Sequence, residues 1–520
     1  MNRAEMLERA LAKRQPWDIV VIGGGATGVG VALDAAARGY EVLLLEQSDF
    51  GKGTSSRSTK LVHGGVRYLE QGNVSLVMEA LKERGLLRQN APHLVGDLAF
   101  VVPNYEWWEA PFYGVGLKVY NLLSGRYGFG TSEILSREET LARLPTIRTE
   151  GLRGGVVYYD GQFDDTRLLV NMATTAAEQG AALLNYAPVT ALLRDRHAFV
   201  DGVVATDLES GRQVRAAARV VINAGGPFCD AVRRLADPDL PPLVAPSQGI
   251  HLVFAGEVLP GGAAIMVPHT SDGRVMFAIP WHGHTVVGTT DTPIEEATLE
   301  PRPFDAEIEF VLETASRYLR QPLTRADVLS VFVGIRPLVR SGDAKSTAAL
   351  SRDHVIHIDP TGLITVTGGK WTTWRSMAEH CVDTAATLVG LPETPCPTRN
   401  LNIHGFHRQA ARFGTLAIYG SDALHIQDLI QDDPALGARL HPALPTCGAE
   451  VVWAARFEMA RTVEDALARR TRALFLNARA AIEMAPAVAT LLAREMERDD
   501  AWRDAQVKVF CDLAAGYLVA

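Results

Sequence analysis

Two short apolar runs near the N-terminus, separated by a segment of small residues, predict a strand–helix–strand unit. Residues 18–22 (DIVVI) are mostly β-branched and apolar, which is typical of a strand buried in a parallel sheet. Residues 26–38 are rich in alanine and other helix formers, and Gly39 stands where that helix would end. The run 41–45 (EVLLL) predicts the second strand. This order is typical of a nucleotide-binding βαβ unit.

Further along the chain, the apolar pattern changes several times between strand and helix. Residues 74–89 have helical periodicity. Strands are predicted at 181–186, 203–211, 219–222, 250–254, 263–267, 275–280, 285–290 and 362–367. Past Pro397 the pattern is mostly helical, with charged amphipathic segments at 462–470 and 478–500.

These elements predict a protein of the α/β and α+β classes, with a Rossmann-like domain interrupted by a second sheet. The nucleotide-binding domain is expected at 18–90, 155–240 and 355–388. A mixed β-sheet domain for the substrate is expected at 91–154 and 241–354, and a C-terminal helical domain at 389–520. A chain of 520 residues has room for such a multi-domain arrangement.

The turn between the first strand and helix carries a complete dinucleotide fingerprint. Gly23, Gly25 and Gly28 match the pattern G-x-G-x-x-G, in which the glycines allow a tight turn, a close approach to a pyrophosphate and close helix–strand packing. The helix N-terminus would face the phosphates. Glu46, at the end of the second strand, can accept hydrogen bonds from ribose hydroxyls and would repel a 2′-phosphate.

Composition narrows the class of protein. The net charge of −9 gives no basic footprint, so we expect no nucleic-acid partner. Five scattered cysteines without a C-x-x-C pair argue against a zinc site or a disulfide framework. Residues 1–17 contain no apolar signal segment, and no run approaches a membrane-spanning length. We therefore expect a cytoplasmic protein.

The segment 53–68 (GTSSRSTKLVHGGVRY) adds candidate chemistry directly behind the fingerprint. It gathers hydroxyls, two arginines, a lysine and a histidine where a flavin ring and an anionic substrate could meet. Ser55 and Ser56 have no accompanying general base, so hydrogen bonds to a flavin explain them better than a nucleophilic role.

Taken together, the motifs give the chain a resemblance to the FAD-dependent glycerol-3-phosphate dehydrogenase family, within the D-amino-acid-oxidase-like flavoproteins. The resemblance covers essentially the whole chain. Its motifs are 22–28, 54–56, 60–69, 223–227, 279–281, 288–291, 334–338 and 368–375. The first of these is shared by many flavoproteins, whereas the full set in this order is specific.

The resemblance implies oxidation of sn-glycerol 3-phosphate to dihydroxyacetone phosphate, with FAD as hydride acceptor and a membrane quinone as electron acceptor. Two other functions remain open. One is an oxidase of the same fold that passes electrons to oxygen and makes peroxide. The other is a non-catalytic flavoprotein whose helical C-terminal region binds a partner. We expect no metal.

The family pattern also implies which residues form the site. Arg67 and Arg336 would bind the substrate phosphate, because a guanidinium matches phosphate oxygens, and Tyr68 and Thr373 would line the pocket. Lys370 would stabilise negative charge on the reduced flavin or polarise the product carbonyl. Cofactor contacts are expected from Gly23, Gly25, Gly28, Glu46, Thr54, Ser55, Ser56, Lys60, Leu61, His63, Gly225, Gly369 and Lys370.

The general base is expected to be a histidine, because imidazole takes up protons near neutral pH. His251 resembles the active-site histidine of the family and is the preferred candidate, with His63 as the alternative. Covalent attachment of the flavin through His63 is also open, although the resemblance implies noncovalent FAD. The paired spacing of His282 and His284 lacks the further ligands of a metal site, so we interpret both as surface residues.

The sequence leaves the interpretation of three features open. The aromatic stretch 107–123 is either core or dimer packing, or a peripheral contact with the inner surface of the cytoplasmic membrane, where a quinone would be reached. The C-terminal helices either cap the core or dimerise, and we expect a homodimer. Arg57 adds a cation beside the expected flavin segment, and the sequence assigns it no role.

Overall fold

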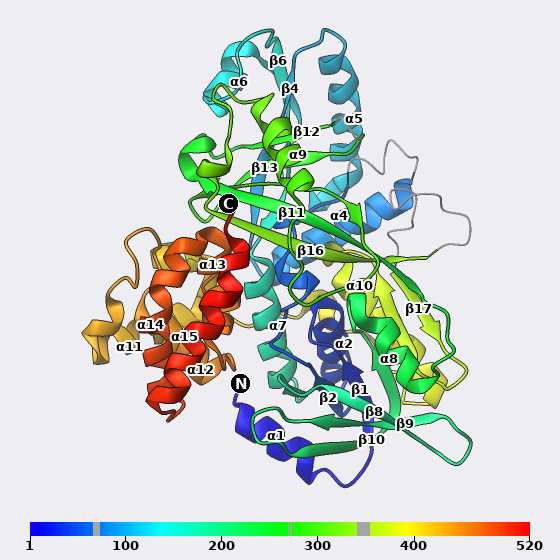
Figure 1. Cartoon of the computed structure of the whole chain (residues 1–520). Helices are drawn as coiled ribbons and strands as arrows, with labels where there is room; N and C mark the ends of the chain where they lie inside the picture. The colour runs from blue at the N-terminus through cyan, green and yellow to red at the C-terminus, as the bar shows by residue number, and fades with distance from the viewer. Residues whose placement is uncertain (66–72, 269, 271–272, 341–353, 520) are drawn as a thin grey trace.

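A computed structural model describes residues 1–65, 73–268, 270, 273–340 and 354–519 of the chain. Within these residues the strands form two sheets, of eight and ten strands. Figure 1 shows the ten-stranded sheet and its helices at the top, the eight-stranded sheet at the bottom, and the C-terminal helices at the left, beside both. The predicted fold class, a mixed α/β protein with a helical C-terminal region, is confirmed.

The eight-stranded sheet is built around the predicted βαβ unit. Its main path runs β17-β18-β10-β1-β2-β7, and the neighbours from β18 to β7 are parallel. The strands are β1 (Trp17–Ile22), β2 (Val42–Leu45), β7 (Ala182–Leu184), β8 (Val189–Arg194), β9 (Val200–Thr206), β10 (Gln213–Asn223), β17 (His354–Ile358) and β18 (Ile364–Gly368). The antiparallel strands β8 and β9 extend from β10.

Both faces of this sheet are covered at its centre, which explains why the strands β1 and β2 are almost continuously apolar. Ile19 and Val21 of β1 face a core shared with three helices, α2 (Ala26–Ala37), α7 (Asp165–Glu178) and α10 (Trp374–Val389). The alternate side chains, Val20 and Ile22, pack toward α1 (Arg3–Ala12) and α8 (Cys229–Ala236). Side chains that alternate between two apolar layers give the unbroken runs seen in the sequence.

The ten-stranded sheet is mostly antiparallel and contains β11 and β16, the strands of His251 and Arg336. Its path is β15-β11-β14-β13-β12-β4-β6-β3, with β16 paired to β11 and β5 to β6. The strands are β3 (Leu61–Val62), β4 (Val95–Asn104), β5 (Glu133–Ser136), β6 (Gly154–Phe163), β11 (Val244–Ala255), β12 (Ala264–Val267), β13 (Met276–Trp281), β14 (His284–Gly288), β15 (Thr292–Pro293) and β16 (Ser330–Val339). The helices α4 (Val74–Asn90), α5 (Glu109–Ser124), α6 (Arg137–Arg143) and α9 (Asp305–Ser316) accompany it.

The C-terminal region is helical, as the sequence predicts, but its charges are distributed differently. It contains α11 (Ala423–Asp432), α12 (Gly448–Phe457), a π-helical segment (Asp465–Arg470), α13 (Ala473–Leu476), α14 (Ala478–Glu495) and α15 (Asp500–Ala514). The predicted helix 478–500 is interrupted, because α14 ends at Glu495 and Asp499 caps α15. The charged segment 462–470 is largely buried, since Arg469 and Arg470 both form ion pairs with Asp49.

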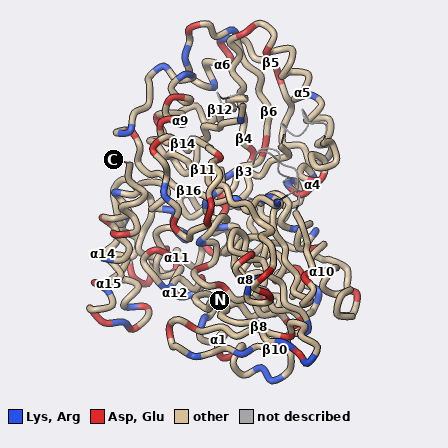
Figure 2. Tube along the Cα trace, turned by 45° about the vertical axis from the view of Figure 1, so that its right-hand side comes forward, with Lys and Arg blue, Asp and Glu red and all other residues tan. Residues whose placement is uncertain are grey.

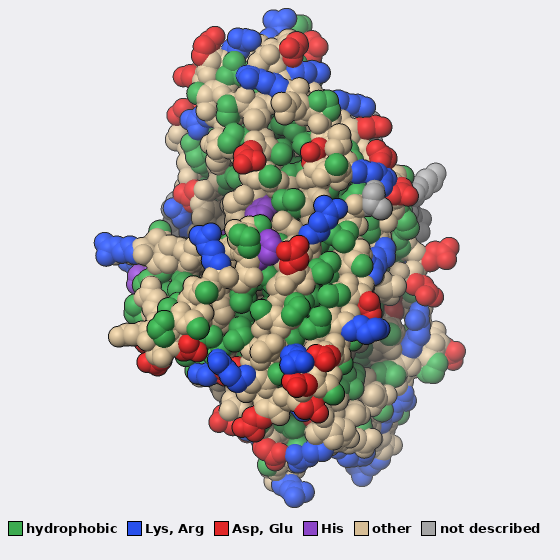
Figure 3. Space-filling model, turned by 60° about the vertical axis from the view of Figure 1, so that its left-hand side comes forward, with side chains coloured by type: hydrophobic (Ala, Val, Ile, Leu, Met, Phe, Trp, Pro, Cys, Tyr) green, Lys and Arg blue, Asp and Glu red, His purple; other side chains and the backbone are tan. Residues whose placement is uncertain are grey.

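Charges of both signs are interspersed along the whole chain (Figure 2). On the face that carries the C-terminal helices, apolar side chains alternate with charged ones (Figure 3). None of the helices among the described residues combines the length and apolar character needed to cross a bilayer.

Candidate active site

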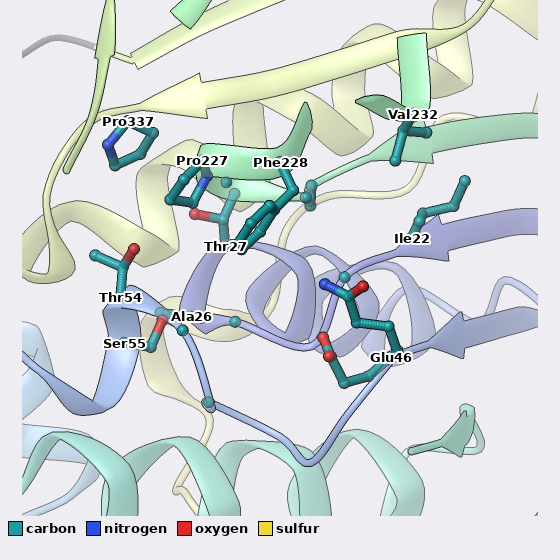
Figure 4. Close-up of a pocket in the computed structure, with 18 of the residues that line it drawn as sticks. Ile22, Ala26, Thr27, Glu46, Thr54, Ser55, Pro227, Phe228, Val232 and Pro337 are labelled. Carbon is teal, nitrogen blue, oxygen red and sulfur yellow. Dashed lines mark hydrogen bonds between the residues drawn. The ribbon is translucent and has the colours of Figure 1, made fainter. Parts of the chain in front are cut away.

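A cavity of about 420 Å³ lies at the C-terminal ends of parallel strands in the first sheet. Its lining includes Gly23 after β1, Glu46 after β2, Gly225 after β10 and Lys370 after β18. Open α/β sheets bind ligands at this edge, because the strand order leaves a crevice there. Figure 4 shows Thr54, Ser55 and Pro337 at one end of the cavity, and Glu46, Ile22 and Val232 at the other. The cavity is therefore elongated, as a dinucleotide requires.

The glycines of the fingerprint are needed for close approaches of the backbone. Gly23 has φ of +112°, and a Cβ on Gly28 would lie 1.9 Å from the carbonyl oxygen of Gly23. Gly25 is the N-cap of α2 and provides no side-chain cap, so the first turn of the helix faces the cavity. A helix N-terminus of this kind favours an anion such as a pyrophosphate.

Glu46 is held at the far end of the cavity by backbone donors. Its Oε2 accepts from the Gly24 N–H at 2.6 Å and its Oε1 from the Ser48 N–H at 2.8 Å. Burial raises the pKa of the Glu46 carboxyl above its ordinary value, and these two donors offset part of the rise. The two donors therefore fix the Glu46 carboxylate at the cavity wall, where the sequence predicts an acceptor for the ribose of a dinucleotide.

The loop 53–56 forms the other end of the cavity and joins two distant parts of the chain. Thr54 and Ser55 line the cavity, and the Ser55 hydroxyl accepts from the Ala26 N–H at 2.9 Å. The Ser55 carbonyl accepts from the Trp371 indole at 2.9 Å. Gly369, with φ of +71°, and Lys370 line the same end of the cavity. The predicted segments 54–56 and 368–373 therefore meet.

His251 lies beside this loop, on strand β11 of the second sheet. Its Nε2 lies 2.9 Å from the Thr59 hydroxyl, and its ring stacks on Phe332 with centroids 4.8 Å apart. The side chain is buried. Burial lowers the pKa of His251 well below its ordinary value, and the positive charges of Lys60 and Arg336 lower it further. His251 is therefore neutral near pH 7 and able to accept a proton.

Arg336 is fixed on the neighbouring strand β16. Its guanidinium donates to the Thr290 carbonyl at 3.0 Å and to the Thr289 hydroxyl at 3.2 Å, and it approaches Asp291 at 3.3 Å. The side chain remains 24% exposed, so it is oriented by protein contacts without being enclosed by them. Arg336 and His251 do not line the cavity themselves, but Pro337, next to Arg336, does.

Three glycines on β11, β14 and β16 stand where no other side chain would fit. A Cβ on Gly249 would lie 2.5 Å from the Arg336 guanidinium, and one on Gly288 would lie 2.5 Å from the His251 ring. A Cβ on Gly334 would lie 2.7 Å from the carbonyl oxygen of Arg57. Glycine at Gly249 and Gly288 therefore leaves room for the Arg336 and His251 side chains, and glycine at Gly334 lets the loop 54–57 approach β16 closely.

The other predicted cofactor residues on this loop have protein partners. Lys60 is fully buried, and its ammonium donates to the Ser56 carbonyl and to Asp165, both at 2.7 Å. Burial lowers the pKa of Lys60 to about 7, although Asp165 acts in the opposite direction. Leu61 belongs to β3 and pairs with Gln162. Lys60 thus anchors the loop from behind and does not line the cavity.

The remaining predicted residues are divided between the site and the part of the chain that is not described. The His63 N–H donates to the Thr372 hydroxyl at 3.2 Å, which brings His63 to the turn that carries Lys370. Thr373 is buried, and its hydroxyl donates to the Lys370 carbonyl at 3.3 Å. Arg67 and Tyr68 lie outside the described residues.

Sequence reasoning missed several residues around the cavity. Lys52 and Gln47 line it between the fingerprint and the loop, and Phe228 and Val232 cover it from α8 and the turn before it. The turn 223–227 gave a signal for the second pair, because the residues that follow a strand-end turn commonly face the same ligand. Arg472, which donates to the Ser56 carbonyl at 2.9 Å, gave no local signal, since it is 416 residues away.

The arrangement combines three chemical capacities. A cavity with a glycine turn and a helix N-terminus suits a dinucleotide. A neutral buried imidazole can accept a proton, and an oriented guanidinium can bind an anionic group. The site therefore suits an oxidation in which a proton and a hydride leave an anionic substrate.

Two family models match the chain, and individual proteins are similar to it over most of its length. The model of the FAD dependent oxidoreductases matches residues 18–380, and that of the C-terminal domain of alpha-glycerophosphate oxidase matches residues 361–503. The mitochondrial glycerol-3-phosphate dehydrogenase SDP6 of Arabidopsis thaliana is 42% identical, over 94% of this chain and 84% of that protein. The mitochondrial glycerol-3-phosphate dehydrogenase of Homo sapiens is 40% identical, over 96% of this chain and 73% of that protein.

Two solved structures of FAD-containing proteins are also similar to this chain. The glycerol-3-phosphate dehydrogenase from Bacillus halodurans, complexed with FAD, is similar with a TM-score of 0.80 and 29% identity, covering 99% of this chain and 97% of that one. The L-alpha-glycerophosphate oxidase from Mycoplasma pneumoniae, with FAD bound, has a TM-score of 0.56 and 15% identity over 74% of this chain and 98% of that one. The second likeness concerns the fold alone.

Proposed function

The chain belongs to the FAD-dependent glycerol-3-phosphate dehydrogenase family, and we propose that it oxidises sn-glycerol 3-phosphate to dihydroxyacetone phosphate and passes the electrons to a quinone. FAD is its cofactor. The observation that carries the proposal is the juxtaposition of the dinucleotide cavity with His251 and Arg336, which come from the opposite sheet.

Each residue then has a defined task in the reaction. When bound, FAD accepts the hydride that leaves C2 of the substrate. Arg336, together with Arg67, binds the phosphate, because its guanidinium is already oriented by Thr289 and Thr290. His251 accepts the proton of the C2 hydroxyl, and Lys370 compensates the negative charge that develops at the flavin end of the cavity. In this proposal Tyr68 and Thr373 line the substrate pocket, as the family pattern implies.

Anaerobic addition of sn-glycerol 3-phosphate to the FAD-loaded protein tests the proposal. The visible absorbance of the oxidised flavin should bleach, because hydride transfer reduces it. Arg336→Ala should require roughly 10- to 100-fold more substrate for half-maximal bleaching, since a charge-assisted contact to the phosphate is lost. An unchanged spectrum with the native protein would contradict a dehydrogenase and favour a non-catalytic flavoprotein.

The identity of the electron acceptor is a separate question with its own measurement. With glycerol 3-phosphate as substrate, turnover with a quinone analogue should exceed peroxide formation in air. A peroxide yield that matches substrate consumption would instead assign the chain to the oxidases.

A surface on α5 supports a membrane quinone as the acceptor. We define the outer face of α5 by six exposed apolar side chains on and just before the helix: Trp107, Trp108, Phe112, Val115, Val119 and Leu122. Trp107 is 74% and Leu122 79% exposed, which is unusual for such large apolar side chains. An amphipathic helix with tryptophans at one end suits the interface of a bilayer. This face is the proposed peripheral membrane contact.

Two further expectations remain predictions. The cytoplasmic location is expected from the sequence, whereas the relatives compared above carry mitochondrial names. The homodimer is likewise a prediction, and sedimentation of the FAD-loaded protein in detergent would test it.

A further inference from the structure

Arg57 directly follows the loop 53–56 that lines the cavity, and the sequence assigns it no role. Its side chain is 3% exposed, so its charge is almost fully removed from water. One terminal nitrogen donates to the Val333 carbonyl at 3.2 Å, and the other to the Glu300 carboxylate at 2.9 Å. A buried arginine with two oriented acceptors holds its surroundings in a fixed geometry.

Arg57 belongs to a row of contacts between the loop 54–57 and strand β16. The Thr54 hydroxyl donates to the Ile335 carbonyl at 2.6 Å, and Arg57 donates to the Val333 carbonyl. Gly334 lies between these two acceptors, where any Cβ would meet the Arg57 backbone. The next residues of the strand lead to Arg336. The row therefore fixes the distance between the cofactor loop and the proposed phosphate-binding arginine.

Glu300, the carboxylate that pairs with Arg57, is bound by Tyr517 near the end of the chain. The Tyr517 hydroxyl donates to Glu300 at 3.1 Å, on the oxygen that does not face Arg57. Tyr517 is 5% exposed, and a Cβ on the preceding Gly516 would overlap Arg302, so the chain end is closely packed on the loop that carries Glu300. Figure 1 shows the C-terminus beside β11, just above the end of the last helix.

A second line of contacts runs from the same tyrosine to the proposed base. The Tyr517 ring meets the edge of Phe475 with centroids 5.6 Å apart, and Phe475 lies 5.0 Å from Phe332. Phe332 stacks on His251. Tyr517 therefore contacts Glu300, the partner of Arg57, and through Phe475 it is connected to Phe332, on which His251 stacks.

We propose that Arg57 is a positioning residue that fixes the cofactor loop against the strand of Arg336, and that the C-terminal end of the chain maintains this geometry through Tyr517 and Glu300. The inference rests on the proposed function only for its readout, the reduction of FAD by glycerol 3-phosphate. It gives the C-terminal region a role in assembling the active site, in addition to capping the core.

The alternative is that Arg57 acts by its charge alone. Loss of a buried cation near the cofactor would then shift the midpoint potential of the flavin, and lysine would replace arginine well. A positioning role predicts the opposite for lysine, because a single ammonium cannot reproduce the planar fork that joins Val333 to Glu300.

Rapid-mixing measurements of flavin reduction on the FAD-loaded protein separate the two. For Arg57→Lys and Arg57→Met, the limiting rate constant of reduction should fall about tenfold or more, because small misplacements of reacting groups are costly. The concentration of glycerol 3-phosphate for half-maximal rate should rise, while the midpoint potential and the FAD content stay at the native values. Tyr517→Phe, which removes only the hydroxyl, should cause a smaller change in the same direction.

Arg325→Met is the matched control, because it removes an arginine that also pairs with two carboxylates, Asp305 and Glu309, but on the surface. This variant should reduce its flavin at the native rate. Native reduction kinetics in Arg57→Lys and Tyr517→Phe would overturn the proposal, even if Arg57→Met failed to fold. If the native protein itself is not reduced by glycerol 3-phosphate, the proposed function fails instead.

Discussion

Two histidines lie near the loop 53–56, and their surroundings differ. His251 is buried against Phe332 with its Nε2 at the Thr59 hydroxyl, and its pKa is lowered, first by burial. His63 is only partly buried, and its backbone N–H is bound to Thr372. His251 is therefore unprotonated near pH 7, which a general base must be when the substrate arrives, and this supports the proposal that His251 is the base.

Substitutions of these two side chains test which of them is the base. His251→Asn should slow flavin reduction by glycerol 3-phosphate about 10²- to 10⁴-fold, the usual contribution of general base catalysis, with FAD still bound. His63→Asn should reduce the rate much less. Because the pKa of His251 is lowered, the native rate should not decline as the pH falls from 8 toward 6.5, the ordinary pKa of a histidine. A slow His63→Asn variant beside a fast His251→Asn variant would transfer the role of base to His63.

The helix α5 has two faces with different environments. Tyr113, Leu117 and Tyr120 are buried, and the Tyr120 hydroxyl donates to Asp160 at 2.6 Å and accepts from the Gly64 N–H at 2.8 Å. The opposite side is the outer face of α5. The inner side of the helix is therefore core, whereas the outer side is exposed, and its contact with a membrane or a second subunit stays a prediction.

Replacing part of the outer face tests the membrane contact. Trp107→Ser combined with Leu122→Ser should weaken binding to phospholipid vesicles by a factor of about 100 or more, because each large apolar side chain contributes about 1.5–3 kcal/mol on burial. Anaerobic bleaching by glycerol 3-phosphate should be unaffected, since both side chains point away from the core. Leu208→Ser with Val509→Ser, two exposed apolar residues elsewhere, is the control. Equal vesicle binding of both double variants would exclude this helix as the contact.

At the level of the whole molecule, an ion-pair cluster joins the C-terminal region to the first domain. His404 contacts Glu178 at the end of α7 at 2.7 Å and Asp422 just before α11 at 2.8 Å. Burial lowers the pKa of His404, but the two carboxylates outweigh this effect and raise it to about 9. The neighbouring His93 has a pKa lowered to about 4, mainly by burial, and stays neutral around pH 7.

This cluster predicts a pH-dependent stability. The folded-state pKa of His404 lies above its ordinary value of 6.5, so the protonated form stabilises the fold below pH 6.5. That contribution is lost as the pH rises through about 9. Solvent near the half-exposed Glu178 limits the effect to about 1–2 kcal/mol. The melting temperature should decline across this window in the native protein and less in His404→Gln. Parallel curves for the two proteins would remove His404 as the cause.

Particular residues show how far the sequence could be interpreted. The elements β1, α2 and β2 and the positions of Gly23, Gly25, Gly28 and Glu46 follow from local patterns, because apolar periodicity and glycine spacing reflect contacts within one βαβ unit. The domain limits and the roles of the site residues remain predictions. Strand β6, which falls within the segment expected for the nucleotide domain, is part of the second sheet, since strand pairing is set by partners distant in the chain.

The sequence by itself determined the dinucleotide-binding unit, the mixed fold class, the helical C-terminal region and the family, since these depend on periodicity and on ordered motifs. Only the tertiary structure decided that Lys60 supports the loop from behind, that the charged segment 465–470 is buried, and that Arg57 joins the cofactor loop to β16 and the chain end. The physical reason is that burial and ion pairing depend on partners more than a hundred residues away, such as Asp165 for Lys60 and Tyr517 for the Glu300 that faces Arg57. A charged residue looks the same in the sequence whether water or a buried carboxylate surrounds it.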